Sequence, residues 1–296
     1  MVDLRRMTGA VVRRVRRAVV SRSAPVRAAR SSPEWSVSDP RGDLSEWWLD
    51  ESRRVAHDLD RVVPGLVETD RPSVCIVCVT NRPEQADHVC DTVLRQSGVG
   101  PLRVVVVLND GIGDATVFRD RLAGFDLDVV HLPPPTTLGA CLNHAWGLAG
   151  TRYVAKIDDD DVYGPHYLRD AVRVLRWSAA AVVGKHTYLA RLHGSGVTVL
   201  RFPGHEWAYS GFVAGGTIVA DSDRIGSARF GDSTTGEDSA FLAAVERHGG
   251  LVLATSALDF VQARHTGNTW QVDEARFLRS ARRLGSDDLS PLVAGA

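Results

Sequence analysis

The amino-acid sequence predicts an α/β protein built on a mostly parallel central sheet with helices on both faces. Three stretches, "SVCIVCVT", "LRVVVVL" and "RYVAKI", are apolar almost throughout, as expected of strands that are covered on both sides. Stretches with helical periodicity alternate with them, which favours parallel strands joined by crossover helices. Polar residues follow each of these strands directly. Because such sheets bind ligands beyond the carboxyl ends of their strands, we expect the functional site there.

The expected elements alternate along residues 73–178 and then change in character. We expect strands at residues 73–80, 102–108, 127–132 and 152–157, and helices at residues 83–96, 138–148 and 165–178. Beyond residue 178 the sequence is richer in strands, with strands expected at residues 180–192 and 212–220 among others and one helix expected at residues 237–248. We expect this part to form a smaller, mixed region that completes the same domain. The main domain is therefore placed at residues 73–270.

The two ends of the chain differ from this main domain. Residues 41–72 are expected to form a helical extension, and residues 271–296 a C-terminal helix and tail. Residues 1–40 form a basic amphipathic segment followed by a linker rich in Ser, Pro, Arg and Ala. Nine arginines and one aspartate occupy residues 1–30.

Such a basic segment is typical of a helix that docks on an anionic membrane surface. It is equally typical of a basic tail, or of a helix that packs on the protein itself. No interleaved aromatic residues accompany the arginines, so nucleic acid is not an expected partner.

Composition narrows the class of protein. The 296 residues are 44% apolar and carry a formal net charge of −1, which suits one large globular domain with an appendage. No apolar run approaches the roughly 20 residues that cross a bilayer, and the N-terminus lacks the hydrophobic core of a secretory signal. The four cysteines are expected to be buried free thiols, since Cys75 and Cys78 would point to opposite faces of a strand. We therefore expect a cytoplasmic protein, with residues 1–30 as its candidate contact to the inner face of the membrane.

The stretch "KIDDDDVYGP" places four adjacent carboxylates, residues 158–161, directly after an expected strand. In a cleft, such carboxylates offer the hard oxygen ligands that Mg²⁺ and Mn²⁺ prefer, and the ion would offset their mutual repulsion. The alternative is a solvated acidic turn in which an aspartate such as Asp161 caps the following helix. The position at the end of a parallel strand favours the metal site.

A second acidic pair lies in "TTGEDSAFLAAVERHG", where Glu237 and Asp238 would occupy the first turn of a helix. Acidic residues there stabilise the helix dipole, which is a purely structural explanation. A carboxylate close to the aspartate cluster could instead act as a general base that deprotonates a hydroxyl group. The pair by itself does not distinguish these roles.

Four segments carry a resemblance to a known family. They are "VCVTNRPEQADHVCDTVLRQ", "VVVVLNDGIGDAT", "TLGACLNHAWGLAGTRYVAKIDDDDVYGPHYL" and "GEDSAFLAAVERHGG". In this order they resemble the inverting, family-2-type glycosyltransferases of the GT-A fold, and the third contains an Asp-X-Asp element. The resemblance covers about residues 73–270. It implies a GT-A-type, Rossmann-like domain whose smaller mixed region lies on the acceptor side.

The resemblance also implies site residues. Asp238 would be the catalytic base, and Glu237 would help to shape the acceptor site. Asp160 would bind Mn²⁺ or Mg²⁺, assisted by Asp158. His265 stands where some GT-A enzymes have a further metal ligand, although a lone histidine is often structural. The nucleotide-sugar would contact Thr80, Asn81, Arg82, Asn109, Asp110, Gly139, Asn143 and Asp159.

The expected function is transfer of a sugar from a nucleotide-diphosphate sugar to a hydroxyl group of a glycan or lipid-linked acceptor. The resemblance implies inversion at the sugar, and the membrane-facing segment would suit cell-envelope or polysaccharide synthesis. A nucleotidyltransferase acting on sugar phosphates is an alternative, but "TNRPEQ" supplies no Gly-rich phosphate loop. A non-catalytic scaffold that binds a divalent ion is another, and the presence of both Glu237 and Asp238 favours an enzyme over it.

Overall fold

The computed structural model describes residues 43–63, 65, 70–109 and 113–295. At its centre lies an eight-stranded sheet with the strand order β3-β2-β1-β4-β10-β6-β11-β9. The first four strands of this order are β3 (Asp126–His131), β2 (Leu102–Leu108), β1 (Val74–Thr80) and β4 (Tyr153–Ile157). They pair in parallel, because the crossover helices return the chain to the same edge each time. The prediction of a mostly parallel central sheet is confirmed.

The other half of this sheet is mixed. Its strands are β10 (Val219–Asp221), β6 (Ala180–Gly184), β11 (Leu251–Ala254) and β9 (Ala208–Tyr209). Strand β10 runs antiparallel to both β4 and β6, whereas β11 runs parallel to β6. The expected strand at residues 212–220 is mostly absent, because residues Gly215–Thr217 form a short 3-10 helix, η5, before β10 begins.

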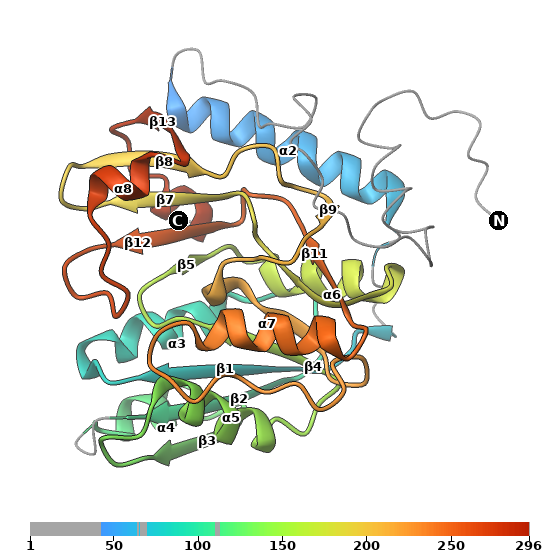
Figure 1. Ribbon diagram of the computed structural model, residues 1–296, viewed down its shortest axis with the longest axis vertical. Helices are drawn as coiled ribbons and strands as arrows, with labels where there is room; N and C mark the ends of the chain where they lie inside the picture. Colours follow the sequence, from blue (N-terminus) through green and yellow to red (C-terminus); the bar gives the residue numbers. More distant parts are fainter. Residues whose placement is uncertain (1–42, 64, 66–69, 110–112, 296) are drawn as a thin grey trace.

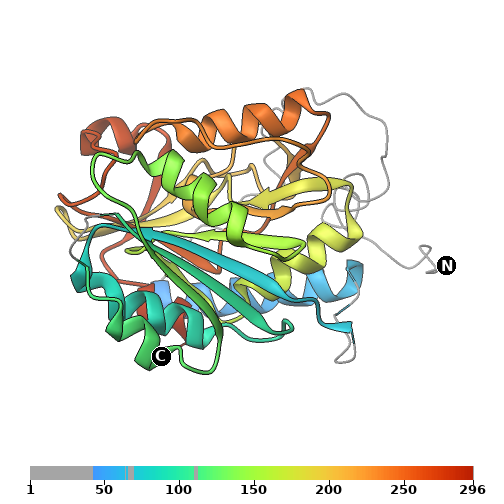
Figure 2. The same cartoon turned by 90° about the horizontal axis from the view of Figure 1, so that it is seen from below.

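Helices cover both faces of the large sheet (Figure 2). One face packs against α3 (Ala86–Arg95), α4 (Thr116–Arg121) and α6 (Tyr167–Trp177), and the other against α5 (Leu138–Leu148) and α7 (Glu237–Arg247). The alternation of side chains along β1 is visible in its cysteines: Cys78 belongs to the core under α3, and Cys75 to the core under α5. All four cysteines are buried free thiols, as expected.

A second, five-stranded sheet lies above the first in Figure 1, in the order β13-β8-β7-β12-β5. Its strands are β13 (Ala281–Gly285), β8 (Val197–Arg201), β7 (Tyr188–Leu192), β12 (Phe260–Arg264) and β5 (Val162–Tyr163). One face packs under α2 (Leu44–Val62), which crosses the top of Figure 1. The expected strand at residues 180–192 is thereby divided, since β6 joins the large sheet and β7 the small one.

The expected boundary at residue 270 is wrong. Residues 271–296 were expected to form a helix and tail, but they contain α8 (Glu274–Leu278), β13 and α9 (Ser290–Ala294). Strand β13 pairs with β8, and Val293 of α9 joins the core beneath α2. The C-terminal segment is therefore an integral part of the domain. The sequence signal for β13, "ARRLG", is weak because polar arginines dominate it.

Helix α2, which forms most of the expected helical extension, begins with a side-chain cap at Asp43. The Asp43 carboxylate accepts hydrogen bonds from the backbone N–H groups of Ser45, at 2.7 Å, and Glu46, at 2.9 Å. The predicted basic amphipathic segment, residues 1–40, lies outside the described residues. Within the described ranges, no helix is both long and apolar enough to cross a membrane.

Candidate active site

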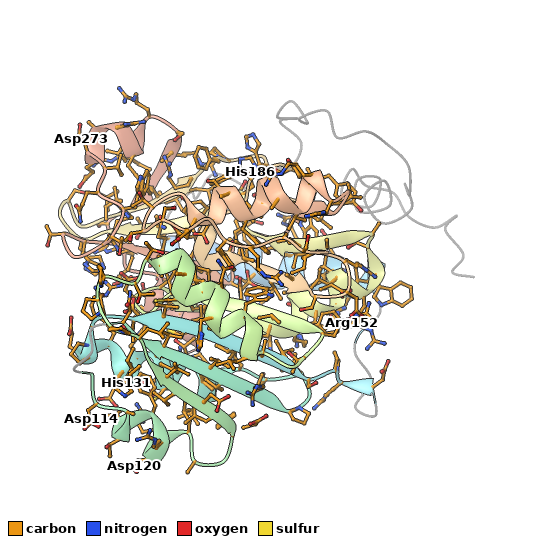
Figure 3. All side chains as sticks on the ribbon, turned by 60° about the horizontal axis from the view of Figure 1, so that its bottom comes forward. Asp114, Asp120, His131, Arg152, His186 and Asp273 are labelled. Atoms are coloured by element: carbon orange, nitrogen blue, oxygen red, sulfur yellow. The ribbon has the colours of Figure 1, made fainter. Side chains whose placement is uncertain are left out.

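A pocket of about 590 Å³ lies where the polar residues following β1, β2 and β4 meet. Figure 3 shows the polarity of the parallel strands: His131, the last residue of β3, is labelled on the opposite side of the molecule from Arg152, which precedes β4. The second sheet and α8 contribute the remaining wall of the pocket. This is the expected place for a ligand in a parallel α/β sheet, and the volume is in the range typical of ligand sites.

Two of the four consecutive aspartates are held by one arginine. The Asp159 carboxylate accepts a hydrogen bond from Thr80 Oγ1 at 2.5 Å and forms an ion pair with Arg82. Arg82 Nη1 also lies 2.7 Å from Asp160 Oδ2. Burial raises the pKa of Asp159, whereas the Thr80 hydroxyl and the Arg82 charge lower it in part. Arg82 therefore offsets the repulsion between these two carboxylates.

Asp160 also reaches the second sheet. Its Oδ2 atom lies 3.0 Å from Nε2 of His265, the residue that follows β12, and 2.9 Å from the Asn268 side-chain nitrogen. The Asn268 side chain in turn accepts a hydrogen bond from the His265 backbone N–H at 2.8 Å. The turn after β12 thus presents an imidazole to a carboxylate that is 105 residues earlier in the chain.

Asp158 and Asp161 point elsewhere. Asp158 Oδ1 lies 2.6 Å from Nζ of buried Lys156. Asp161, which is 2% exposed, accepts a hydrogen bond from the Ala263 backbone N–H at 2.9 Å and so links β12 to the aspartate run. Its expected role as a helix cap is wrong, because the residue before α6 is His166. Asp161 is structural, and burial holds its pKa well above the usual range.

The first turn of α7 brings a second pair of carboxylates to the pocket. Gly236 precedes the helix with a φ of 83°, a left-handed conformation that favours glycine, and Glu237 and Asp238 follow directly. Asp238 Oδ2 lies 3.5 Å from Nζ of Lys156. A Cβ atom on Gly215 would collide with the Asp238 carboxylate, so this close approach requires glycine.

Lys156 is the electrostatic link between the two acidic groups. Burial alone would lower its pKa, but the carboxylates of Asp158 and Asp238 raise it above the usual value, so the lysine is charged. Asp238 Oδ1 has no hydrogen-bond partner among the described residues. The Asp238 side chain lines the pocket and is 21% exposed, so its carboxylate is able to receive a proton from a ligand.

The model of the glycosyl transferase family 2 matches residues 74–202. This range includes the first three of the four segments that carry the resemblance. The match covers less than half of the chain, which therefore resembles this family over that segment. No curated protein matches the sequence.

Solved structures support the GT-A fold of this chain. S. aureus TarS 1-349 in complex with UDP-GlcNAc is 18% identical with a TM-score of 0.53, over 71% of this chain and 64% of that chain. The mannosyltransferase PcManGT from Pyrobaculum calidifontis, in complex with GDP-Man and Mn²⁺, is 18% identical with a TM-score of 0.53, over 79% of this chain and 70% of that chain. The chain thus spans less than two thirds of the TarS 1-349 chain.

The structure places most of the predicted site residues at the pocket. Those that line it are Asn81, Arg82, Asn109, Asp158, Asp159, Asp160, Glu237 and Asp238. Asp110 lies outside the described residues. Asn109 donates a hydrogen bond to the Thr136 carbonyl at 3.0 Å, and its buried Oδ1 has no partner in the described part of the chain.

Three predicted contacts of the nucleotide-sugar do not line the pocket. Thr80 is buried beneath Asp159 and orients it. Gly139 is packed against the Gly231 backbone, where a Cβ atom would collide. The Asn143 side chain donates to the Phe230 carbonyl and accepts from the Phe230 N–H, at 3.0 and 2.9 Å. In the structure these residues position the walls of the site.

The predicted metal ligands are only partly brought together. No group of three His, Cys, Asp or Glu side chains in the described ranges is arranged to hold a metal ion. Asp160 and His265 face one another, but Asp158 is paired with Lys156 instead. The Asp160 carboxylate fits an Mn²⁺ or Mg²⁺ ion that would take its remaining ligands from water and diphosphate, whereas the His265 imidazole is a less usual ligand for such hard ions.

Lys156 and Tyr163 also shape the site, although the sequence pattern by itself assigns no role to either residue. The Tyr163 hydroxyl donates to the Gly216 carbonyl at 2.7 Å and accepts from the Asp158 N–H at 2.9 Å. It thereby fixes the aspartate run against η5. The sequence feature that points to Lys156 is its position on an apolar strand two residues before Asp158, because a buried charge needs a partner.

We expect the stability of the protein to depend on pH through Glu237. Burial, and then the charge of Asp238, raise the pKa of Glu237 from 4.5 to about 7. The folded protein therefore binds a proton that the unfolded chain releases, and stability is lost as the pH rises towards and through 7. At 1.36 kcal/mol per pKa unit, the loss is about 3 kcal/mol.

Urea unfolding at pH values from 5 to 8 measures this effect. The Glu237→Gln variant should gain stability relative to the wild type as the pH rises, because glutamine has no proton to lose. Glu84→Gln, on an exposed turn, is the matched control and should follow the wild type at every pH. Parallel curves for Glu237→Gln and the wild type would contradict the buried, protonated state of Glu237.

Proposed function

We propose that the protein transfers a sugar from a nucleotide-diphosphate sugar to an acceptor hydroxyl, with inversion at the anomeric carbon. The observation that carries this proposal is the position of Asp238. It lines the same pocket as the aspartate run, lies beside the buried Lys156, and keeps one carboxylate oxygen without a partner in the described residues. These are the properties required of a general base next to a diphosphate site.

The two ends of the pocket suggest how the donor is bound. Asn81, Arg82 and Asn109 line the pocket after β1 and β2, where the nucleotide of a parallel α/β sheet is expected. The donor diphosphate would lie towards Asp160 and His265. Gly215 and Gly216, which lie close to the carboxylates of Asp238 and Asp158, would face the sugar.

The chemical step then uses groups of this chain. Asp238 accepts the proton of the acceptor hydroxyl as its oxygen forms a bond to the anomeric carbon. The bond from that carbon to the diphosphate oxygen breaks, and the nucleoside diphosphate leaves with the electron pair. Burial raises the pKa of Asp238, and the charge of Lys156 opposes this shift and orients the carboxylate. Arg82 supplies positive charge near the leaving group. No covalent enzyme intermediate is required.

A divalent ion is part of the proposal. Asp160 and His265 would hold Mn²⁺ or Mg²⁺, which neutralises charge on the departing diphosphate when it is bound. PcManGT, which has the same fold, is described in complex with Mn²⁺. Asn268 would keep the Asp160 carboxylate in position through its 2.9 Å hydrogen bond.

The test is a panel of nucleotide-sugars incubated with the protein and Mn²⁺, with release of nucleoside diphosphate as the readout. UDP- and GDP-linked sugars come first, because structures with this fold bind UDP-GlcNAc and GDP-Man. Release from one donor supports the transferase. Pyrophosphate release from a nucleoside triphosphate and a sugar phosphate would instead favour a nucleotidyltransferase, and release from none would favour a non-catalytic protein.

We place the protein at the cytoplasmic face of the membrane through residues 1–30, with a glycan or lipid-linked acceptor in cell-envelope synthesis. Deleting these residues is expected to weaken binding to vesicles that contain anionic lipid, by about 1 kcal/mol for each arginine that contacts the surface. Vesicle co-sedimentation measures this. Neutral vesicles, and anionic vesicles at high salt, are the controls. Equal binding of the full chain and the deletion variant would remove the membrane-docking role.

A further inference from the structure

One wall of the pocket is rich in arginine. The proposed function gives its arginines no role in binding the nucleotide-sugar donor. This wall is formed by the second sheet and α8, and its basic residues are Arg201, Arg264 and Arg276. We propose that this wall binds a negatively charged group, a phosphate or a carboxylate, on the sugar acceptor. This inference rests on the proposed function, because it specifies the acceptor of the same site.

The backbone of the second sheet directs these side chains to the pocket. Strands β7, β8 and β12 are paired with Tyr188 opposite Arg201 and Ala190 beside Gln262. Because side chains alternate along a strand, Tyr188, Arg201, Gln262 and Arg264 share one face, and all four line the pocket. The opposite face carries the apolar residues that pack under α2.

Arg201 is buried without a carboxylate partner. It is 5% exposed, and its guanidinium donates to two neutral acceptors, the Phe277 carbonyl and the Ser280 hydroxyl. The guanidinium carbon lies 3.8 Å from the centroid of the Phe277 ring and 4.3 Å from that of Phe202. Its Nε atom has no hydrogen-bond partner among the described residues. Stacking holds the cation in place but does not neutralise it.

Arg264 is half-buried and also forms no ion pair with a described carboxylate. Its Nη2 atom donates to the Trp270 carbonyl at 2.9 Å, and its guanidinium lies 5.1 Å from the Trp270 ring and 5.5 Å from the Phe277 ring. Arg201 and Arg264 therefore share the Phe277 ring. The two cations are thus close enough to repel each other.

These arginines differ from others in the described part of the chain. Buried Arg173 pairs with Asp60 and Asp170, and Arg82 pairs with Asp159 and Asp160. Arg201, Arg264 and the exposed Arg276 form no ion pair with any described carboxylate. A buried charge without a partner is costly, so a site that places buried Arg201 beside half-buried Arg264 is suited to an incoming anion. The planar guanidinium matches both phosphate and carboxylate oxygens.

The surroundings of the arginines suit a sugar chain. Trp270 and Phe212 line the same pocket and are 47% and 37% exposed, which offers flat apolar surfaces at its rim. Gln262 Oε1 is buried with no hydrogen-bond partner in the described ranges and could accept from a hydroxyl group. Figure 3 labels Asp273, which caps α8, at the rim of the molecule beside this wall. The acceptor class that fits is a glycan or polyol chain bearing phosphodiesters or uronic acids.

Direct binding to the full-length protein tests this inference without requiring turnover. The probes are a glycerol phosphate trimer, trigalacturonate and neutral maltotriose, titrated by calorimetry in the presence of Mn²⁺ with UDP or GDP. We expect one of the anionic probes to bind at least about tenfold more tightly than maltotriose. The stronger of the two distinguishes phosphate from carboxylate. Equal binding of all three probes would overturn the inference.

Matched variants locate the binding to the wall. Arg264→Gln and Arg276→Gln should weaken the anionic probe, with the Arg264 change costing about 10- to 100-fold because a charge-assisted hydrogen bond is lost. Arg264→Lys should lose less. Arg247→Gln, on the exposed end of α7, is the control and should have no effect. Melting curves check that each variant folds.

Measurements of nucleotide binding and of diphosphate release distinguish a failure of this inference from a failure of the proposed function. If the arginines serve the acceptor, Arg264→Gln should weaken binding of the anionic probe far more than it weakens binding of the nucleoside diphosphate. If it weakens nucleotide binding and leaves the probes unaffected, the arginines belong to the donor site and the inference is wrong. Failure of the transferase itself would appear as no diphosphate release from any donor in the wild type, whatever the probes do.

Discussion

Replacing Asp238 by asparagine is expected to lower kcat by about 10²- to 10⁴-fold, the range typical for loss of a general base. The asparagine side chain has nearly the same shape but cannot accept the proton of the acceptor hydroxyl. Donor binding should be nearly unchanged, because Lys156 keeps its 2.6 Å contact with Asp158. Nucleoside diphosphate release and donor affinity, measured on the same preparation, separate the two effects.

Asp120→Asn is the control for this experiment. Asp120 is an exposed residue of α4, labelled in Figure 3, and does not line the pocket. Its replacement should leave both kcat and donor affinity at wild-type values. If Asp238→Asn lost donor affinity with no specific loss of turnover, Asp238 would be a binding residue and not the base.

The second large effect is expected at the metal pair. Asp160→Ala and His265→Ala should each raise the Mn²⁺ concentration needed for half-maximal activity by at least about tenfold. Losing even an outer partner of a metal ligand commonly costs about 10- to 100-fold in affinity. Titration of Mn²⁺ into the chelator-treated enzyme, with diphosphate release as the readout, measures this.

Asn268→Ala provides an intermediate case. Asn268 contacts both Asp160 and the His265 backbone, so its loss should disturb the pair without removing a ligand. A smaller shift in Mn²⁺ dependence is expected. Undiminished activity of the wild-type protein in excess EDTA would contradict the role of Asp160 and His265 as metal ligands.

The central fold was predictable because its local signals agree with one another. Strands β1 and β2 are apolar almost throughout, and the helix at Leu138–Leu148 was placed at its observed bounds. The errors fall where tertiary contacts override local pattern. Strand β13 is rich in arginine and pairs only because β8 provides an edge, and the glycines before β10 form a 3-10 turn against the carboxylates of the site.

The site was predictable to a similar extent. The position of the aspartate run after a parallel strand indicated a cleft, and the acidic turn of α7 does line the same pocket. The different partners of the four aspartates could not be read from the sequence, because they depend on Lys156, Arg82 and β12 coming together in space. Nor could the unpaired state of Arg264, since the chain contains many arginines and the sequence does not indicate which of them lie beside a carboxylate.

The most direct test of the central claim is the configuration of the sugar released when water replaces the acceptor. Proton NMR of the reaction with the active donor, recorded before mutarotation, identifies the anomer formed first. In-line attack assisted by Asp238 predicts the inverted anomer from the wild-type protein, and a rate reduced about 10²- to 10⁴-fold in Asp238→Asn. Initial release of the retained anomer, or equal rates for the two proteins, would contradict it.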